Sequence, residues 1–445
     1  MSPSLDISVI RQSYSDNILR GPYDEATRDI QCSLRFLVRA DGSKWHIKIT
    51  FRGTLPSRDV KPSELHRKRD FDKLCRSLDI GSLSLINDTV TEIVLSNTVP
   101  DSCHAAPSYA TDTLMPPDAA NKLKDEPCNM YACVVHQMQI VDLREDPTRM
   151  RFLPCDHDRI PTRDLTSIRE ERGLGAGVCV AYVDGDGDGD SDAEPYIYKT
   201  FNRVDYIPVD TEVLVHELEN LATLQDAQNI VRLKAIVTSI DPYQTCESGQ
   251  GTTVGQGLLL EYHANGTLRD ALESSESRPW KQWALHIATG LDQMHQHGLT
   301  HMDIKPSNIV ISAESKAILI DVSGRGFDHA WLSPEMQSLE SPPSQPFPAR
   351  VANDTWAFGK LALEMANASH DEAERSLLSN LHARCTAAAP SERASLGAVI
   401  RLLESPPPTQ SRPSRTRRWY DILGRFSKKM SSSLRIGSSR PGPSR

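Results

Sequence analysis

The sequence predicts an α+β protein in which a small N-terminal unit precedes a larger region of mixed strands and helices. Apolar and polar residues alternate from Gln31 to Arg52, and Asp41-Gly42-Ser43 interrupts them, which predicts a β-hairpin. Between residues 163 and 404, strand-like and helix-like segments follow one another and are separated by turn residues. The length of 445 residues is enough for two ordinary domains.

The composition excludes several classes of protein. The chain has 50 Lys and Arg against 59 Asp and Glu, so we expect no specific nucleic acid binding. No apolar run approaches the roughly 18 residues of a membrane helix, and the first residues are unlike a secretory signal. The 9 cysteines have no paired C-x-x-C spacing, so neither a zinc site nor a disulfide framework is indicated. We therefore expect an intracellular protein, either cytoplasmic or nuclear.

Composition and pattern divide the chain into five parts. In the first part, the hairpin is followed by a charged amphipathic helix from Pro62 to Leu78 and a strand around Glu92 to Leu95. The second is rich in Pro, Ala, Asp and Ser, which is typical of a linker. The expected parts are a small α+β module at 1–100, a linker at 101–127, a connecting segment or extra strands of the next domain at 128–162, that domain at 163–404, and a disordered basic tail at 405–445.

The strongest chemical signal is the loop His301-Met302-Asp303-Ile304-Lys305-Pro306-Ser307-Asn308. A helical pattern from Trp283 to His297 precedes it, and two short strands, Ile309–Ile311 and Ala317–Ile320, lead from it to Asp321. The loop supplies a base, a cation and an amide oxygen, and the second strand delivers a further carboxylate. Phosphoryl transfer to a hydroxyl needs this set of groups, with a metal ion to neutralise the phosphates. The structural alternative is a buried polar loop that only caps a helix.

These residues resemble the eukaryotic protein kinase superfamily, and Lys305, two residues after Asp303, is a feature of its Ser/Thr branch. The resemblance implies a two-lobed protein kinase-like fold, with a β-rich small lobe, a helical large lobe and ATP between them. It also implies Asp303 as the catalytic base, Lys305 as a contact of the γ-phosphate, and Asn308 and Asp321 as Mg²⁺ ligands. In this fold, residues 128–162 are the candidates for extra strands of the small lobe.

Other segments match the family in the same order. Tyr196-Ile197-Tyr198-Lys199 is an apolar strand that ends where the family has its phosphate-binding lysine. The helix predicted from Thr211 to Gln225 places Glu217 on the face of its leucines, whereas Glu219 points to solvent. We therefore expect Glu217 to form the ion pair with Lys199.

The hinge and the large lobe are matched as well. Leu258-Leu259-Leu260-Glu261-Tyr262 resembles the hinge, which implies that backbone groups from Glu261 to His263 bind adenine with Leu260 beside it. The remaining matches are Ser333-Pro334-Glu335 at the end of the activation segment, Asp354-Thr355-Trp356-Ala357-Phe358-Gly359 in an anchoring helix, and Arg393 as the structural partner of Glu335.

The phosphate-binding loop departs from the family pattern. It reads Gly173-Leu174-Gly175-Ala176-Gly177-Val178-Cys179-Val180, so Gly175 and Gly177 are candidate ATP contacts. The third expected glycine is Val178 or Val180, and a β-branched residue restricts a close approach to phosphate. Whether this loop binds ATP is left open by the sequence.

The metal and activation segments also depart from the pattern. Asp321-Val322-Ser323-Gly324 replaces Asp-Phe-Gly, and Ser323 lacks the flexibility of glycine. Met302 stands where an arginine answers activation-loop phosphate, so we expect no switching by phosphorylation. The segment from Asp321 to Glu335 is short, which implies an unusual substrate surface or none. Short segments that end in Trp-Leu-Ser-Pro-Glu are similar to divergent kinase-like proteins of filamentous fungi.

Two further segments have competing interpretations. The acidic run from Asp184 to Asp192 begins like a calcium loop, but Pro195 occupies the twelfth position where a glutamate is needed, which favours a solvated hairpin loop. From Pro406 to Arg445 the tail has ten basic residues and one acid, Asp421, together with aromatic residues. Contact with an anionic membrane, a partner groove, a nuclear import signal and a solvated tail are the alternatives.

Three functions follow from these observations. The first is a divergent Ser/Thr-type protein kinase that uses ATP and Mg²⁺, with an unknown protein substrate or partner. The second is a pseudokinase that acts as a scaffold, favoured by the altered phosphate loop, Ser323 and the short activation segment. The third is phosphoryl transfer to a small molecule.

Overall fold

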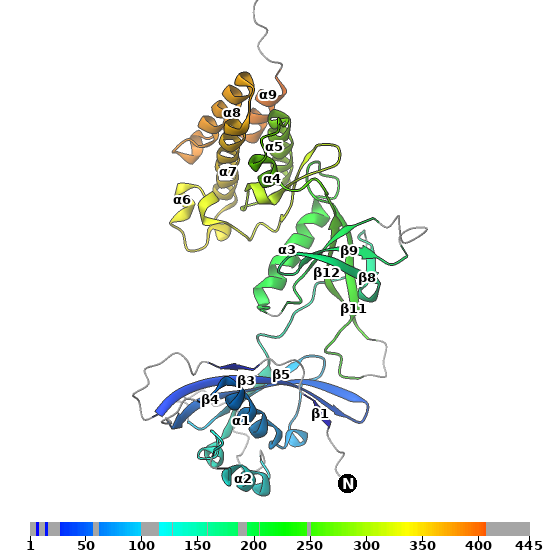
Figure 1. The fold of residues 1–445 in the computed structure, drawn as a ribbon, viewed down its shortest axis with the longest axis vertical. Helices are drawn as coiled ribbons and strands as arrows, with labels where there is room; N and C mark the ends of the chain where they lie inside the picture. Colours follow the sequence, from blue (N-terminus) through cyan, green and yellow to red (C-terminus); the bar gives the residue numbers. More distant parts are fainter. Residues whose placement is uncertain are drawn as a thin grey trace, which may run out of the picture.

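The computed structural model describes residues 6–8, 14–16, 27–56, 62–98, 115–126, 128–157, 159–185, 194–203, 205–246 and 251–405 (Figure 1). In this part of the chain there are two sheets of six strands, a two-stranded sheet and a set of helices. The basic tail and most of the acidic run lie outside the described residues. None of the helices described combines the length and apolarity needed to cross a membrane.

The N-terminal sheet is built around the predicted hairpin. The strands β3 and β4 pair along their whole length, and the turn residues Asp41 and Gly42 have φ angles of 49° and 73°, which match the twist of a two-residue hairpin. The sheet order is β1-β3-β4-β5-β6, with β2 paired to β3. The bounds are β1 Asp6–Ser8, β2 Ser15–Asp16, β3 Thr27–Ala40, β4 Ser43–Pro56, β5 Val90–Ser96 and β6 Gln139–Glu145.

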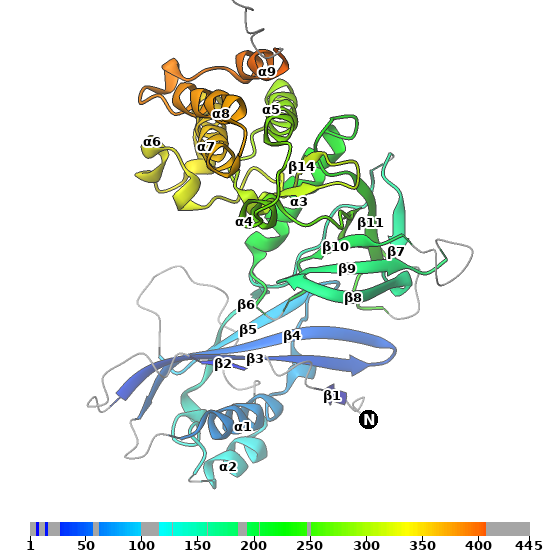
Figure 2. The same cartoon turned by 45° about the horizontal axis from the view of Figure 1, so that its top comes forward.

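The helices of this module cover one face of its sheet (Figure 2). They are α1 Glu64–Arg76, the short helix η1 Ile80–Ser82, α2 Pro117–Lys124 and the short helix η2 Val135–Gln137. Tyr131 is fully buried in the core, and its ring centroid lies 5.4 Å from that of Phe51 and 5.6 Å from that of Phe71. Aromatic and aliphatic burial of this kind gives the module a core of its own.

The module extends beyond the residues that the sequence assigned to it. Helix α2 lies within the expected linker 101–127, and its Leu123 is buried in the N-terminal core. Within 128–162, strand β6 pairs with β5 of the N-terminal sheet, so the prediction that this stretch supplies strands to the small lobe is wrong for β6. The physical reason is that the apolar residues Val134, Val135 and Ile140 complete this core, and β6 covers an otherwise open sheet edge.

The second six-stranded sheet has the order β7-β11-β12-β10-β9-β8. Its pairings are antiparallel except for β7 with β11. Helix α3 Pro208–Thr223 packs beside this sheet (Figure 1). The bounds are β7 Thr162–Asp164, the short helix η3 Leu165–Ser167, β8 Ile168–Gly175, β9 Val178–Val183, β10 Tyr196–Thr200, β11 Leu233–Ile240 and β12 Thr253–Glu261.

The remainder of the described chain is mainly helical and is packed around α5 and α7. Trp280 and Trp283 are buried at the start of α5, with ring centroids 5.3 Å apart in an edge-to-face arrangement. The two-lobed α+β architecture is therefore as expected. The bounds are α4 Leu268–Glu273, α5 Trp280–Gln296, η4 Pro306–Asn308, β13 Ile309–Ile311, β14 Ala317–Leu319, η5 His329–Trp331, α6 Pro334–Gln337, η6 Pro342–Ser344, α7 Phe347–Ala368, α8 Glu372–Cys385, η7 Pro390–Glu392 and α9 Leu396–Glu404.

Candidate active site

Lys199 is the meeting point of three elements. It lies on β10 between Val178 of β9 and Leu258 of β12. Its Nζ donates hydrogen bonds to Glu217 Oε2 at 2.5 Å and to Asp321 Oδ1 at 2.6 Å. The ion pair expected between Lys199 and Glu217 is therefore present, and Asp321 joins it.

The pKa values of Lys199, Glu217 and Asp321 depend on one another. Burial disfavours the charged form of Lys199, but the Glu217 and Asp321 carboxylates outweigh it and raise the pKa of the ammonium group. Burial raises the pKa of Glu217, opposed by Lys199, and the nearby Asp321 raises it further. Burial acts in the same direction on Asp321, but Lys199 outweighs it and lowers the pKa of that carboxyl. The lysine is thus held as a cation between two acids.

Helix α3 presents Glu217 because of its periodicity. Thr211, Leu214, Leu218 and Leu221 are buried on the face that carries Glu217, whereas Glu219 is exposed, as the sequence predicted. The helix starts three residues before the predicted position. Pro208 occupies its first turn, and the Asp210 carboxylate accepts a hydrogen bond of 3.0 Å from the Ile207 N–H.

The catalytic-loop candidates lie together around Asp303. Lys305 Nζ donates to Asp303 Oδ1 at 3.0 Å, and its distance to Oδ2 is 2.8 Å. Asn308 Nδ2 donates to the Asp303 Oδ2 and to its carbonyl, both at 2.8 Å. These contacts hold the carboxylate in one orientation, which a general base requires before it can accept a proton.

The loop that carries Asp303 is fixed by a buried acid on α7. Asp354 is fully buried and accepts hydrogen bonds of 2.8 Å from the backbone N–H groups of His301 and Met302. His301 Nδ1 accepts a hydrogen bond from the Asp303 N–H at 3.3 Å, and Nε2 of the same ring lies 2.9 Å from the Ile320 carbonyl oxygen. The histidine thus ties the loop to the strand that precedes Asp321.

The metal-binding candidates form a donor set that suits a hard cation. The Asp321 side chain is 46% exposed, and among the described residues its second carboxylate oxygen accepts no hydrogen bond. Asn308 orients its amide nitrogen toward Asp303, which leaves the amide oxygen with only a 3.4 Å hydrogen bond from Ser307 Oγ. Mg²⁺ keeps several water ligands and needs one or two protein oxygens in addition to phosphates, so these two residues fit it.

The segment after Asp321 adopts a backbone conformation that does not require a glycine at position 323. The left-handed conformations fall on Asp321, with φ 60°, and on Gly324, with φ 67°, and not on Ser323. A Cβ on Gly324 would lie 2.7 Å from the Thr300 carbonyl oxygen, so the glycine is required there. The sequence predicted that Ser323 would reduce flexibility, but Ser323 does not have to adopt a left-handed conformation here, so the substitution causes no backbone strain.

The phosphate-loop candidates form a tight hairpin between β8 and β9. Gly177 has φ 73°, its carbonyl accepts a 2.7 Å hydrogen bond from the Thr200 N–H, and a Cβ there would overlap the Thr200 carbonyl oxygen. Gly175 faces open space, and its residue partner across the hairpin is Val178. Val180 is buried, whereas Val178 is half-buried. Through β9, the hairpin is therefore paired with the strand that carries Lys199.

The hinge candidates follow the end of β12. Leu260 is buried between Leu233 and Ile197. The Glu261 N–H donates to the Arg232 carbonyl at 3.1 Å, and the Glu261 carboxylate accepts from the Arg232 N–H at 3.0 Å. His263 Nε2 lies 3.3 Å from Glu261 Oε1. The hinge is thereby braced against the loop that precedes β11.

Two contacts near the candidate site were not predicted from the sequence. Met302 is buried with Leu332 and Met336, so the position of the missing arginine is filled by an apolar cluster under the activation segment. Asn220, one turn after Glu217, donates to the Val322 carbonyl at 2.7 Å. Its helical spacing from Glu217 was the available hint. The expected pair of Glu335 with Arg393 is present as two parallel hydrogen bonds of 2.6 and 2.8 Å.

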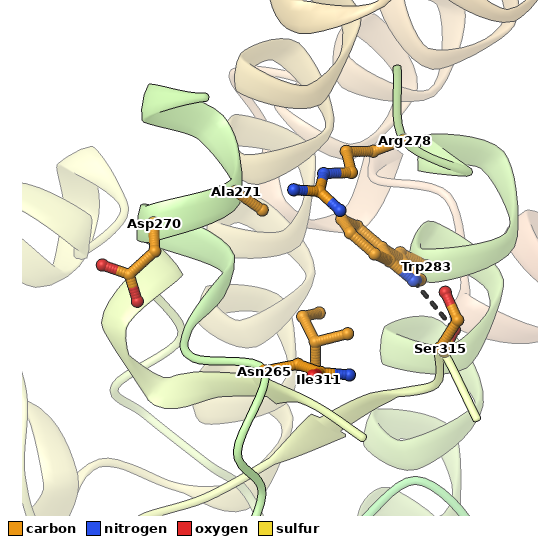
Figure 3. A pocket seen from close by; sticks show the side chains of 7 residues that line it. All are labelled: Asn265, Asp270, Ala271, Arg278, Trp283, Ile311 and Ser315. Atoms are coloured by element: carbon orange, nitrogen blue, oxygen red, sulfur yellow. Dashed lines mark hydrogen bonds between the residues drawn. The ribbon is translucent and has the colours of Figure 1, made fainter. Parts of the chain in front are cut away.

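A cavity of about 320 Å³ lies apart from these residues, between α4, the start of α5 and the β13–β14 hairpin (Figure 3). The Trp283 Nε1 donates a 2.9 Å hydrogen bond to the Ser315 carbonyl at its wall. The predicted site residues are not among those that line it. The lining residues are Asn265, Asp270, Ala271, Arg278, Trp283, Ile311 and Ser315.

Comparison with known proteins agrees with this geometry. Residues 171–370 match the sequence model of the protein kinase domain. The chain is 27% identical over 187 residues to mitogen-activated protein kinase kinase 9 of Arabidopsis thaliana, a match over 39% of this chain and 55% of that protein. It is 32% identical over 122 residues to mitogen-activated protein kinase kinase kinase 17 of the same plant, over 25% of this chain and 32% of that protein.

A third relative is cytokinesis protein sepH of Aspergillus niger, 26% identical over 186 residues, which are 39% of this chain and 12% of that protein. The chain thus covers at most about half the length of these relatives. The two-lobed fold and the arrangement of the candidate residues agree with a protein kinase domain. The match of residues 171–370 and these relatives support a protein kinase domain of the eukaryotic protein kinase superfamily in this part of the chain. Members of this class use ATP and a divalent metal ion.

Proposed function

We propose that this chain is a Ser/Thr-type protein kinase that transfers the γ-phosphoryl group of ATP to a hydroxyl group. The observation that carries the proposal is the position of Lys199 Nζ, 2.5 Å from Glu217 and 2.6 Å from Asp321. A lysine that is aligned by one acid and lies next to a second, partly exposed acid is suited to hold nucleotide phosphates beside a metal ion. The same arrangement has little value for a chain that only needs a folded surface.

In this proposal each loop residue has one chemical task. Asp303 accepts the proton of the acceptor hydroxyl group while the oxygen of that hydroxyl group bonds to the γ-phosphorus. The bond from that phosphorus to the oxygen that bridges it to the β-phosphorus breaks, and ADP leaves. Lys305 neutralises charge on the γ-phosphate. Asn308 and Asp321 are the residues that would hold Mg²⁺, which would supply positive charge beside the phosphates.

The remaining nucleotide contacts follow from the hinge and the hairpin. Backbone groups of Glu261 to His263 bind adenine, with Leu260 forming the wall beside it. Gly175 and Gly177 cover the phosphates. The open space at Gly175 supports this placement because a ligand can approach its backbone closely.

The second candidate is a scaffold without catalysis, and the short activation segment favours it. Peptide substrates of kinases dock on this segment, which here runs only from Asp321 to Glu335. A chain of this kind would fold and bind partners but transfer no phosphate. Transfer to a small-molecule hydroxyl is the third candidate, because it needs no peptide platform.

We include in the proposal a catalytic domain at 163–404, an N-terminal module before it, and an intracellular location. The basic tail beyond residue 405 is proposed to contact an anionic membrane or a partner. Deleting residues 406–445 should leave unfolding of the remainder unchanged but alter localisation or partner affinity. Loss of stability in the shortened chain would contradict this role.

The test is a transfer assay with labelled ATP and Mg²⁺ on the full chain. Three acceptor pools are used: proteins and peptides, small hydroxyl compounds, and none. Label in the protein pool supports the proposed kinase. Label only in the second pool assigns a small-molecule substrate. If no pool is labelled although Mg²⁺ and ATP bind, the scaffold is the correct function.

A further inference from the structure

We propose that the segment from Asp146 to Leu153, which we term the strap, fixes helix α3 to the N-terminal module, and that Tyr206 and Thr211 are positioning residues for the Lys199–Glu217 pair. The proposal rests on the proposed kinase function for its effect on catalysis. Its structural basis is a continuous set of contacts from the sheet of the module to the first turn of α3.

The strap begins at a buried acid in the N-terminal module. Asp146 has a fully buried side chain and pairs with Lys48 Nζ at 2.8 Å and with Arg35 Nη2 at 3.0 Å. It also accepts a 2.9 Å hydrogen bond from the Thr148 N–H. Arg35 and Lys48 belong to β3 and β4, so the first residues of the strap are held to the central hairpin of the module.

The last two residues of the strap, Phe152 and Leu153, pack against the small lobe. Leu153 and Gly255 exchange two backbone hydrogen bonds of 3.0 Å, and a Cβ on Gly255 would come within 2.7 Å of the Leu153 Cβ. The ring centroid of Phe152 lies 6.1 Å from that of Phe201 and 5.6 Å from that of Tyr243. The glycine is therefore the residue that lets the strap lie directly on β12.

The residue before these two, Arg151, takes part in a triangle of hydrogen bonds at α3. The Arg151 N–H donates to Tyr206 Oη at 3.0 Å, and Thr211 Oγ1 donates to the Arg151 carbonyl at 3.0 Å. Tyr206 Oη and Thr211 Oγ1 also lie 3.0 Å apart. Thr211 is 3% exposed and, like Glu217, belongs to the buried side of α3, which also carries Leu214 between them. Displacement of the strap would therefore displace the face that aligns Lys199.

A second set of contacts joins the N-terminal module to the small lobe. Asp88 and Thr245 exchange hydrogen bonds of 2.7 and 2.8 Å, and the Lys44 N–H donates to the Thr245 carbonyl at 2.8 Å. The ring centroids of His46 and Tyr243 lie 5.0 Å apart, and Tyr243 Oη accepts a 3.2 Å hydrogen bond from the Met150 N–H. The loop between β11 and β12 thus joins the module and the strap.

The test uses Tyr206→Phe and Thr211→Val in the full chain, since each removes a hydroxyl and keeps the shape of the side chain. The controls are Tyr182→Phe, whose ring lies 5.1 Å from the Arg169 guanidinium, and Thr223→Val at the end of α3. One hydrogen bond is worth about 1 kcal/mol, so we expect kcat to fall about fivefold in each test variant and to stay unchanged in the controls. Amide hydrogen exchange of residues 209–223 should rise in the test variants.

A cycle with Glu217→Gln separates positioning from general destabilisation. If the strap acts through Glu217, adding Tyr206→Phe to Glu217→Gln should lower kcat by less than twofold. A full further fivefold loss, or unchanged kcat and unchanged exchange in the single variants, would overturn the proposal. A wild-type chain without transfer would refute the kinase function alone. In that case the exchange of residues 209–223 decides on the strap, with faster exchange supporting it and unchanged exchange refuting it.

Discussion

The side-chain amide of Asn220 on α3 donates a 2.7 Å hydrogen bond to the backbone carbonyl of Val322, the residue after Asp321. Helix α3 therefore contacts the candidate metal-binding segment directly, in addition to reaching Lys199 through Glu217. Because the two side chains lie one turn apart, a shift of α3 would change the positions of Lys199 and Asp321 together. The position of α3 is therefore linked to the positions of both Lys199 and Asp321.

Replacing Asn220 with alanine should weaken this link. We expect transfer to fall about five- to tenfold, because the Val322 carbonyl loses its partner and Asp321 loses its support. The measurement is kcat for ATP turnover beside Asn380→Ala, a control on α8 whose side chain accepts a hydrogen bond from Arg384. Equal rates in the two variants would show that Asn220 does not position Asp321.

Alanine at Gly177 should destabilise the phosphate-loop hairpin. Gly177 has φ 73°, and a methyl group there overlaps the Thr200 carbonyl, whereas a methyl group on Gly173 meets nothing within 4 Å. We expect Gly177→Ala to lower the free energy of unfolding by about 2 kcal/mol and to weaken ATP binding. Denaturant unfolding of both alanine variants gives the comparison. Equal stability of the two would mean that the turn is not held as described.

Activity should not depend on phosphorylation of the activation segment. Met302 packs on Leu332 and Met336, so the segment is anchored by apolar contacts where a guanidinium would otherwise meet a phosphate. Phosphatase treatment of the purified chain should leave the transfer rate unchanged within twofold. Met302→Ala should instead lower the free energy of unfolding by about 3 kcal/mol. A tenfold loss of rate after phosphatase treatment would contradict this account.

The pair of Glu335 with Arg393 should appear in the pH dependence of stability. Burial opposes ionisation of Glu335, but Arg393 outweighs it and holds the pKa of the carboxyl below its usual value of 4.5. A carboxyl with a lowered folded-state pKa stabilises the protein above the unfolded pKa, and the contribution is lost as the pH falls through the folded pKa. The melting temperature of the wild type should therefore fall more steeply below about pH 4.5 than that of Glu335→Gln. Parallel curves would show that the pair is not coupled to folding.

The sequence predicted the parts of the site that local pattern determines. Helical periodicity separated Glu217 from Glu219, and strand alternation placed the hairpin of the N-terminal module. The contacts of Lys199 with Asp321 and of Asn220 with Val322 join residues about one hundred positions apart, so no local pattern contains them. These contacts form only through the tertiary packing of distant segments.

The extent of the N-terminal module was harder to predict than the site. Strand β6 pairs with β5 across a long intervening stretch, and its sequence alternates in a way that would suit either sheet. The backbone conformation of the Asp321 segment was not predicted from the sequence, for a related reason. The left-handed residues are Asp321 and Gly324, and a motif comparison shows which residues differ but not how φ is distributed among them.

The central claim is that Asp303 is the base of a working phosphoryl-transfer site. The most direct measurement compares Mg²⁺-dependent transfer from labelled ATP by the wild-type chain, Asp303→Asn and the control Asp292→Asn, with nucleotide affinity measured on the same samples. We predict a loss of at least about 100-fold in the first variant with affinity almost unchanged, and wild-type transfer in the control. Transfer by Asp303→Asn within a few fold of the wild-type rate would contradict the claim. An absence of transfer from all three chains would contradict it as well.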